Sequence, residues 1–403
     1  MPSEFAGHWT LDPSVTFLNH GSFGATPRSV LDAQSAWRER MEREPVAFFT
    51  RILEPAMDEA RAALGAFIGA DPDDLALVPN ATAAINTVAR SLELQPGDEI
   101  LTTDHAYNAA SNALAAVARR SGAAVRVAAL QFPGTSHDAA LDVILGAVTP
   151  RTRLVLLDHV TSPTALVLPV AEIVHALSET GVETLVDGAH APGMIDLDLD
   201  AIGAAFYAGN CHKWMSAPKG AGFLHVRRDV QARVRPLAIS HGANSMRPDR
   251  TRFRLEHDWT GTFDPSALLS IPAAIDFGAE LVDGGWAALM VRGHDLALHG
   301  RDVLCAALAV DAPAPDEMIG SMATVPLAFA RDDGPPADAE TDDVVHAALE
   351  GQGIQVSVAP WPRRPDGGPW RRLVRFSAAP YVAAEDLERL ARTLPAVLAE
   401  LAA

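Results

Sequence analysis

Short apolar runs alternate with longer segments whose apolar residues recur every three or four positions along the first two thirds of the chain. Near-continuous apolar runs such as 154–157 favour parallel strands buried on both faces, and the longer segments favour amphipathic helices. The alternation therefore predicts an α/β fold with helices between the strands of a sheet. Strands are expected at 75–78, 99–103, 154–157, 184–186 and 204–209, and helices at 55–68, from 81 and at 265–281.

The pattern changes at about residue 286 to helices and strands in a mixed order. The expected elements are helices at 287–308 and 341–352, strands at 322–327, 354–358 and 371–377, and a last helix from 385. At 403 residues the chain is long for a single core, so two domains are expected. We place an N-terminal arm at 1–16, a large domain at 17–285 and a small α+β domain at 286–403.

Composition and charge narrow the classes of function. Hydrophobic residues make up 48% of the chain and charged residues 21%, as in globular proteins. A net charge of −19 argues against a surface for nucleic acid or anionic membrane. No uncharged stretch reaches about 18 residues and the start lacks a signal-peptide pattern, so a cytoplasmic protein is expected. The two cysteines, Cys211 and Cys305, have no metal-binding spacing, so we expect no metal site.

Two strand ends carry the most distinctive chemistry. The strand 184–186 leads into D-G-A-H-A-P-G, which starts at Asp187, and the strand 204–209 leads into G-N-C-H-K-W, which contains Lys213. An acid and a lysine at one sheet edge match the needs of pyridoxal 5′-phosphate, because the lysine carries the cofactor as a Schiff base and the acid pairs with the pyridine nitrogen. Taken alone, either residue is more often a surface lysine or a strand-end aspartate. The pair favours the cofactor.

A third strand end is typical of a phosphate site. The strand 75–78 is followed by a Pro79-Asn80 turn, and a helix of small residues starts at once. Backbone N–H groups at a helix start bind phosphate, and a threonine hydroxyl adds a donor, so Ala81 and Thr82 are the candidate phosphate ligands. A plain asparagine cap on the helix is the alternative interpretation of this segment.

The two motifs around Asp187 and Lys213 resemble those of the class V aminotransferases, a family of fold-type I pyridoxal phosphate enzymes. The likeness is greatest to the isopenicillin N epimerase branch and extends from F-L-N-H-G-S-F-G near the start to R-F-S-A-A-P-Y near the end. It implies a large domain built on a mostly parallel seven-stranded sheet, followed by a smaller α+β C-terminal domain. It also implies pyridoxal 5′-phosphate as cofactor and an amino-acid-like substrate.

Two histidines near the lysine are further candidates for cofactor contacts. His190 lies three residues after Asp187 and is expected to order its carboxylate or the cofactor ring, and the resemblance implies that His212 contacts the phosphate. Asn210 occupies the position of a serine in the S-x-H-K motif of cysteine desulfurases. This departure leaves the exact phosphate contact open.

Two more segments are assigned in the same way. Thr161 and Ser162 follow the strand 154–157 at the end where open α/β sheets place their ligands, and they supply a donor to the phenolic oxygen of the cofactor. A turn that merely ends the strand is the equally weighted alternative. Thr262, in H-D-W-T-G-T, reaches the phosphate of the neighbouring subunit, which implies a homodimer with shared active sites.

An aromatic or imidazole ring should stack on the cofactor opposite the lysine, and the segment D-H-A-Y-N offers two such rings. Likeness to cysteine desulfurases selects His105, whereas relatives nearer the epimerase branch carry a tyrosine two positions later and select Tyr107. Both residues are therefore candidates for catalysis, with preference for Tyr107.

Substrate binding is assigned to the two ends of the chain. An arginine on an apolar strand is costly unless its guanidinium meets an anion, and the resemblance gives Arg375 the α-carboxylate of the substrate. A structural salt bridge is the alternative. Asn19, Gly21 and Ser22 are expected to lie over the substrate, and the loop 360–370 is expected to form a lid.

Three reactions are compatible with these motifs. Lys213 would remove the α-proton of an amino acid, after which reprotonation gives an epimer, expulsion of a side-chain group gives a lyase product, and protonation of the cofactor gives transamination. A persulfide-forming desulfurase is disfavoured because the loop 360–370 contains no cysteine. The resemblance favours an epimerase. A cofactor-fold protein that only binds ligands is disfavoured because Lys213, Asp187 and Arg375 are all present.

Overall fold

The computed structural model describes residues 3–328, 343–361 and 371–402. A seven-stranded sheet lies at the centre of the larger part, with the strand order β2-β8-β7-β6-β5-β3-β4 among the described residues. Strands β7 to β4 of this order run parallel, and β8 runs antiparallel to both of its neighbours. The strands are β2 (Leu75–Val78), β3 (Glu99–Thr103), β4 (Ala124–Ala128), β5 (Thr152–Asp158), β6 (Glu183–Gly188), β7 (Phe206–Asn210) and β8 (Gly222–Val226).

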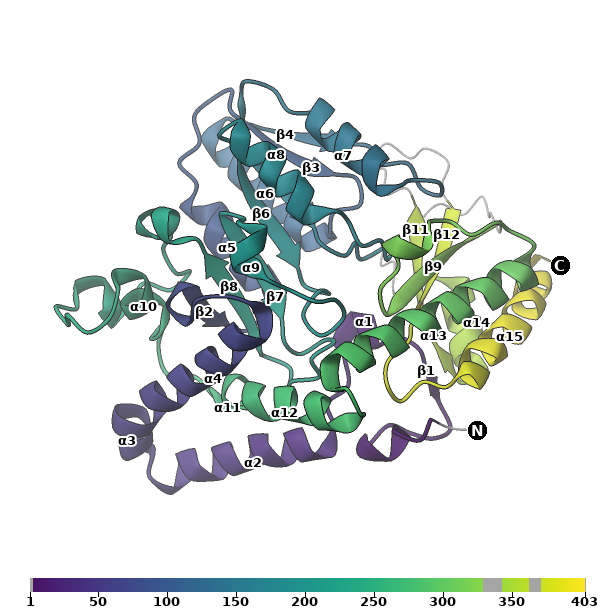
Figure 1. Cartoon of the computed structure of the whole chain (residues 1–403), viewed down its shortest axis with the longest axis horizontal. Helices are drawn as coiled ribbons and strands as arrows, with labels where there is room; N and C mark the ends of the chain where they lie inside the picture. Colours follow the sequence, from purple (N-terminus) through teal and green to yellow (C-terminus); the bar gives the residue numbers. More distant parts are fainter. Residues whose placement is uncertain (1–2, 329–342, 362–370, 403) are drawn as a thin grey trace.

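Helices cover both faces of this sheet (Figure 1). On one face Leu154, Leu156 and Leu185 are buried in one apolar cluster, and on the other Val155 and Val186 belong to a second. Burial on both faces explains why these strands are continuously apolar. The helices of this part are α2 (Arg28–Arg43), α3 (Pro45–Ala47), α4 (Leu53–Ile68), α5 (Ala81–Ser91), α6 (Asn108–Ser121), α7 (His137–Gly146), α8 (Val170–Glu179), α9 (Leu199–Ile202), α10 (Arg252–His257), α11 (Ser266–Leu269) and α12 (Ile271–Leu281).

The C-terminal part packs long helices against a three-stranded antiparallel sheet in the order β11-β12-β9. The N-terminal segment joins it, because β1 (Thr16–Phe17) pairs with β10 (Ile354–Gln355) and leads into α1 (His20–Phe23). In Figure 1 these elements lie together on the right of the molecule. The remaining elements are β9 (Met322–Leu327), β11 (Ser357–Trp361), β12 (Arg371–Ser377), α13 (Gly285–Leu308), α14 (Val344–Gly351) and α15 (Ala384–Ala402).

The predicted α/β architecture is confirmed, and two predicted elements are divided. The helix expected at 265–281 consists of α11 and α12, since Pro272 lacks an N–H group and the second helix begins just before it. The strand expected at 354–358 divides at Val356, so that β10 pairs with β1 and β11 pairs with β12. The expected lid falls largely at 362–370, outside the described residues. The limits of the arm and of the two domains stay predictions.

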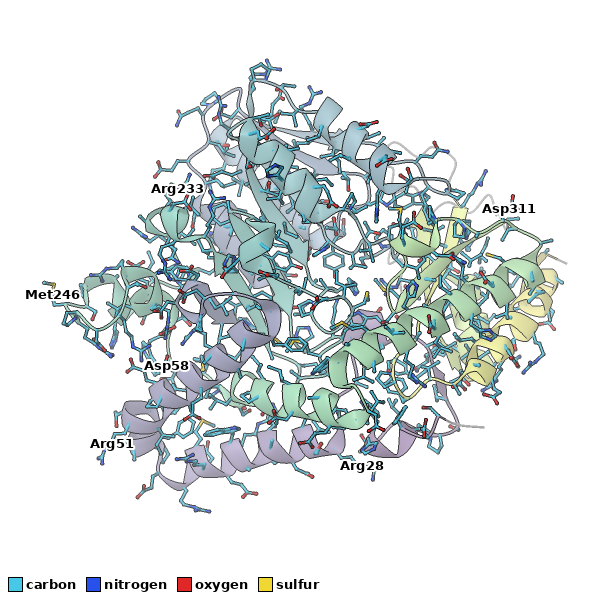
Figure 2. All side chains as sticks on the ribbon, in the orientation of Figure 1. Arg28, Arg51, Asp58, Arg233, Met246 and Asp311 are labelled. Atoms are coloured by element: carbon cyan, nitrogen blue, oxygen red, sulfur yellow. The ribbon has the colours of Figure 1, made fainter. Side chains whose placement is uncertain are left out.

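A segment between β8 and α10 projects from the body of the molecule, and Met246 lies at its far end with 91% of its surface exposed (Figure 2). Ion pairs anchor its base, since Arg250 contacts Asp58 of α4 at 2.5 Å and Arg254 contacts the same carboxylate at 2.6 Å. None of the described helices is both long enough and apolar enough to cross a membrane.

Candidate active site

Asp187 and Lys213 come together at the C-terminal edge of the sheet. Asp187 lies near the end of β6, in register with Ala208 of the parallel strand β7, and Lys213 follows β7 by three residues. Their charges interact, because Lys213 lowers the pKa of the Asp187 carboxyl group. The structure therefore brings the predicted acid and lysine to one site, as parallel strands that end at the same edge require.

Asp187 has the environment that a cationic ring nitrogen would need. Its side chain is buried, and Oδ1 accepts a hydrogen bond from the N–H of Ala189 at 3.0 Å. Burial raises the pKa of this carboxyl group and outweighs the opposing effects of that hydrogen bond and of Lys213. The pKa of the Asp187 carboxyl group is thus raised even with Lys213 nearby. A pyridinium nitrogen would supply the further positive charge, so the residues present fit the cofactor.

The backbone around Lys213 is held by two close glycine contacts. Gly24 has a φ of 70°, and a Cβ there would lie 2.2 Å from the carbonyl oxygen of His212. Gly193 has a φ of 83°, and a Cβ there would lie 2.7 Å from the backbone of Trp214. Any other residue would meet both backbone strain and a clash at these positions. The glycines of F-G and A-P-G therefore fix the course of the lysine segment.

His20 and Tyr381 complete this support, and the sequence analysis did not select them. The N–H of Ala25 donates to Nδ1 of His20 at 3.2 Å and the hydroxyl of Tyr381 lies 2.8 Å from the same atom, so Nε2 carries the proton and donates to the carbonyl of Lys213 at 2.9 Å. Burial lowers the pKa of His20 to about 4, so the ring is neutral at pH 7. His20 belongs to the motif N-H-G and Tyr381 to the motif A-P-Y, and these motifs were the sequence feature that could have pointed to them.

The predicted phosphate site lies where α5 begins beside β7. Asn80 caps the helix by accepting from the N–H of Ala83, and Asn210 accepts from the N–H of Ala81, each at 2.8 Å. The N–H of Ala81 is thus used by the chain itself, whereas Thr82 between them is exposed. Asn210, at the serine position of the motif, ties the lysine-bearing strand to the start of the helix.

His212 and Thr161 have defined partners of their own. Nδ1 of His212 donates to the carbonyl of Ala221 at 2.8 Å, and burial together with Lys213 and Lys219 lowers the pKa of this histidine to about 4. Thr161 is fully buried and its hydroxyl lies 2.7 Å from that of Thr164. Its hydroxyl also accepts from the N–H of Leu166 at 2.8 Å, which is compatible with the turn interpretation, and its contact with the cofactor stays a prediction.

Arg375 of β12 gathers the predicted substrate-binding residues. It is buried, and its guanidinium donates to the carbonyl of Ser162 at 2.6 Å, the hydroxyl of Ser162 at 3.0 Å and the hydroxyl of Ser22 at 3.0 Å. It also donates to Oδ1 of Asn19 at 3.5 Å. The acceptors in these contacts are neutral oxygens, and a guanidinium pairs well with a carboxylate, as the predicted role of Arg375 requires. Gly21 lies beside them, and its N–H donates to Ser377.

The two candidate rings after β3 have different surroundings. His105 is fully buried, with Nδ1 2.7 Å from the hydroxyl of Thr164 and Nε2 3.2 Å from the carbonyl of Leu130. Its ring packs edge-on against Trp361, at 4.5 Å between ring centres. Tyr107, at the start of α6, is 40% exposed. Both nitrogens of His105 thus contact the protein, whereas the ring of Tyr107 is accessible.

Thr262 was predicted to reach the phosphate of a neighbouring subunit. It is exposed on the loop between α10 and α11 in the single chain. Its contact with a neighbouring subunit, and the homodimer that this contact implies, stay predictions.

Comparison with known proteins places the chain in a family. The model of the family described as Aminotransferase class-V matches residues 24–390. The chain belongs to the class V aminotransferases. It is 36% identical over 416 residues to isopenicillin N epimerase of Streptomyces clavuligerus, with 98% of both proteins covered. It is also 31% identical over 341 residues to L-cysteine desulfhydrase of Arabidopsis thaliana, which covers 81% of this chain and 73% of that protein.

The solved structures agree on the fold of this class V aminotransferase. The cysteine desulfurase CsdA of Escherichia coli superposes with a TM-score of 0.77 and 21% sequence identity, covering 98% of both chains. The fold-type I architecture predicted from the sequence is therefore confirmed. Enzymes of this family use pyridoxal 5′-phosphate, and the predicted cofactor is confirmed with the family.

Proposed function

We propose that this class V aminotransferase acts at the α-carbon of an amino acid or a derivative of one, and that it is an epimerase. The observation that carries the proposal is the placement of two cations around one imidazole. Nζ of Lys213 lies 3.1 Å from Nε2 of His190, and the charges of Lys213 and Arg375 both lower the pKa of this histidine, so the lysine that would carry the cofactor and an arginine that can bind a carboxylate lie near the same ring. An α-amino acid carries these two functional groups on one carbon.

Each residue of the site has its own role in the proposed reaction. Arg375 binds the substrate carboxylate with Asn19 and Ser22 beside it, and this contact orients the α-carbon. Bound pyridoxal phosphate acts as an electron sink that makes the α-proton acidic. Lys213 holds the cofactor and takes the α-proton, while Asp187 keeps a negative charge beside the ring nitrogen. Tyr107 delivers a proton to the opposite face, which inverts the configuration.

The relatives support epimerisation and also a second candidate. The likeness to isopenicillin N epimerase extends over 98% of the chain, and the likeness to L-cysteine desulfhydrase covers 81%. A lyase that cleaves a C–S bond without a catalytic thiol is therefore the second candidate. The two cysteines of the chain do not suit a persulfide carrier, because Cys211 and Cys305 are buried and burial raises the pKa of both thiols.

The test is incubation of the holoenzyme with a panel of L-amino acids and cysteine conjugates in D₂O. Deuterium at Cα, chirality, keto acid and released thiol are followed together. Deuteration with loss of optical purity and without keto acid is the expected result. Formation of a keto acid with ammonia or a thiol would show that the enzyme is a lyase and not an epimerase. Formation of a keto acid with transfer of the amino group would show that it is an aminotransferase.

Two variants separate the roles of the proposed acid and base. Lys213→Ala should abolish deuterium exchange at Cα, because the base is lost. Tyr107→Phe should retain exchange on one face and lower inversion by about 100-fold, since a positioned general acid contributes roughly that much. Equal loss of exchange and inversion in Tyr107→Phe would assign both proton transfers to other groups.

A further inference from the structure

Trp214, the residue after the lysine, contacts the imidazole that faces the lysine amine. The indole Nε1 donates to Nδ1 of His190 at 3.4 Å, and Nε2 of His190 lies 3.1 Å from Nζ of Lys213. Trp214 and His190 are both at least nine-tenths buried. The three side chains thus form a row from indole to imidazole to amine inside the site.

The indole determines where the imidazole proton lies. An indole N–H group can only donate, so Nδ1 of His190 has to present its lone pair. A neutral imidazole carries one proton, which is then on Nε2. The other tautomer would place the Nδ1 hydrogen of His190 against the Nε1 hydrogen of Trp214, with no acceptor between them.

The imidazole is neutral in this environment. Burial lowers the pKa of His190 well below its usual value, and the positive charges of Lys213 and Arg375 oppose its protonation further. Asp187, three residues earlier on the same segment, is the acidic group of the site, and its own pKa is raised by burial. The ring of His190 therefore carries a single proton, which lies on Nε2.

An N–H group at Nε2 also constrains the lysine. An ammonium group has no lone pair and cannot accept a hydrogen bond, so the 3.1 Å contact is a hydrogen bond only when the amine of Lys213 is neutral. We propose that Trp214 is a positioning residue that fixes His190 in the Nε2–H tautomer and thereby favours the neutral amine of Lys213. The neutral amine is the nucleophile: its nitrogen bonds to the aldehyde carbon of pyridoxal phosphate, and its two protons leave with the aldehyde oxygen as water.

The tautomer can be measured without cofactor or substrate. The ¹⁵N shifts of labelled histidine in the apoprotein distinguish a protonated from an unprotonated Nδ1. An unprotonated Nδ1 at His190 is expected in the unaltered chain, and Trp214→Phe should shift it toward a mixture of tautomers. A protonated Nδ1 in the unaltered chain overturns the inference. Because this result depends on no reaction, it is independent of whether the chain is an epimerase.

Uptake of pyridoxal phosphate by the apoprotein tests the consequence for the lysine. The rate of visible-absorbance growth is measured against pH. Trp214→Phe should move the midpoint up by about one pH unit, which corresponds to roughly tenfold slower uptake below it. The matched control is Trp286→Phe, which removes an indole hydrogen bond to Ile275 and none to His190, and should leave the midpoint unchanged.

A double mutant shows whether Trp214 acts through the tautomer of His190 or only through packing. His190→Gln presents an amide N–H whatever its neighbour donates, so adding Trp214→Phe to it should change the midpoint no further. If Trp214→Phe has its full effect in the His190→Gln background, Trp214 acts by packing and the inference is wrong. An absence of any visible absorbance in the unaltered chain would instead contradict the cofactor role of Lys213 itself.

Discussion

Arg375 is a buried charge that is held by neutral groups in its described contacts. The hydroxyls of Ser162 and Ser22 and the amide oxygen of Asn19 hold the two ends of its guanidinium, which fixes the plane of the group before a carboxylate arrives. These residues come from two distant segments of the chain. Their common partner explains why polar residues occur at these positions of otherwise apolar segments.

Replacing the guanidinium by an ammonium tests this arrangement. Arg375→Lys keeps the charge but loses the planar pair of donors, so we expect amino acids to bind about 30- to 150-fold more weakly, from the loss of roughly 2–3 kcal/mol in charge-assisted bonds. Spectral titration of the holoenzyme measures this affinity. Amino-acid amides, which lack the carboxylate, serve as control ligands. An equal loss for amides and acids would assign Arg375 to the structure alone.

At the scale of elements, the site depends on how α5 is joined to β7. Strand β7 carries the lysine segment, and the hydrogen bond from the N–H of Ala81 to Asn210 joins its end to the helix start. The sequence predicted a phosphate site at this helix but not that Asn210 would occupy one of its N–H groups. Asparagine is longer than the serine of the related motif, and only the distance between the two elements shows which group it reaches.

Shortening that side chain should loosen the two elements from each other. Asn210→Ala removes a buried acceptor from Ala81 and should lower the free energy of unfolding by about 1–3 kcal/mol. It should also weaken the binding of pyridoxal phosphate, measured by equilibrium dialysis, by about tenfold. Ser136→Ala is the matched control, because Ser136 caps α7 at Ala139 away from the site. The control should lower stability by about 1 kcal/mol and leave cofactor affinity unchanged.

At the scale of the molecule, the sequence predicted the layers and the sheet edge better than the details between them. Periodicity located strands such as β2 and β9, and the position of Asp187 followed from it. The roles of His20 and Tyr381 depend on contacts between residues 361 positions apart, which no local pattern reports. The choice between His105 and Tyr107 likewise depends on burial, which two residues in one turn do not reveal.

Buried neutral histidines make the whole fold sensitive to acid. Burial lowers the pKa of His20, His105 and His159 to about 4, while each has a pKa near 6.5 when unfolded. The unfolded chain therefore binds more protons between pH 6.5 and 4, and stability is full above 6.5 and falls as the pH falls through this range. Each ring contributes a slope of about 1.4 kcal/mol per pH unit. Urea unfolding of the apoprotein at several pH values measures the summed slope of the free energy of unfolding against pH.

One variant isolates a single ring in this measurement. His159→Gln should reduce the slope between pH 6.5 and 4 by about one proton, that is by roughly 1.4 kcal/mol per pH unit. His175→Gln, at an exposed position on α8, is the matched control. A slope that stays the same in His159→Gln would show that this histidine is not neutral in the folded protein.

The pairing of β1 with β10 orders the events of synthesis. The segment that carries Asn19 and Ser22 is synthesised before Gln355, where the strand beside it ends, and before their common partner Arg375. Asn19 must wait for a residue 356 positions later before it can make this contact. A nascent chain can assemble its central sheet while it is still being translated, but the contacts of Asn19 and Ser22 with Arg375 form only after residue 375 has been made.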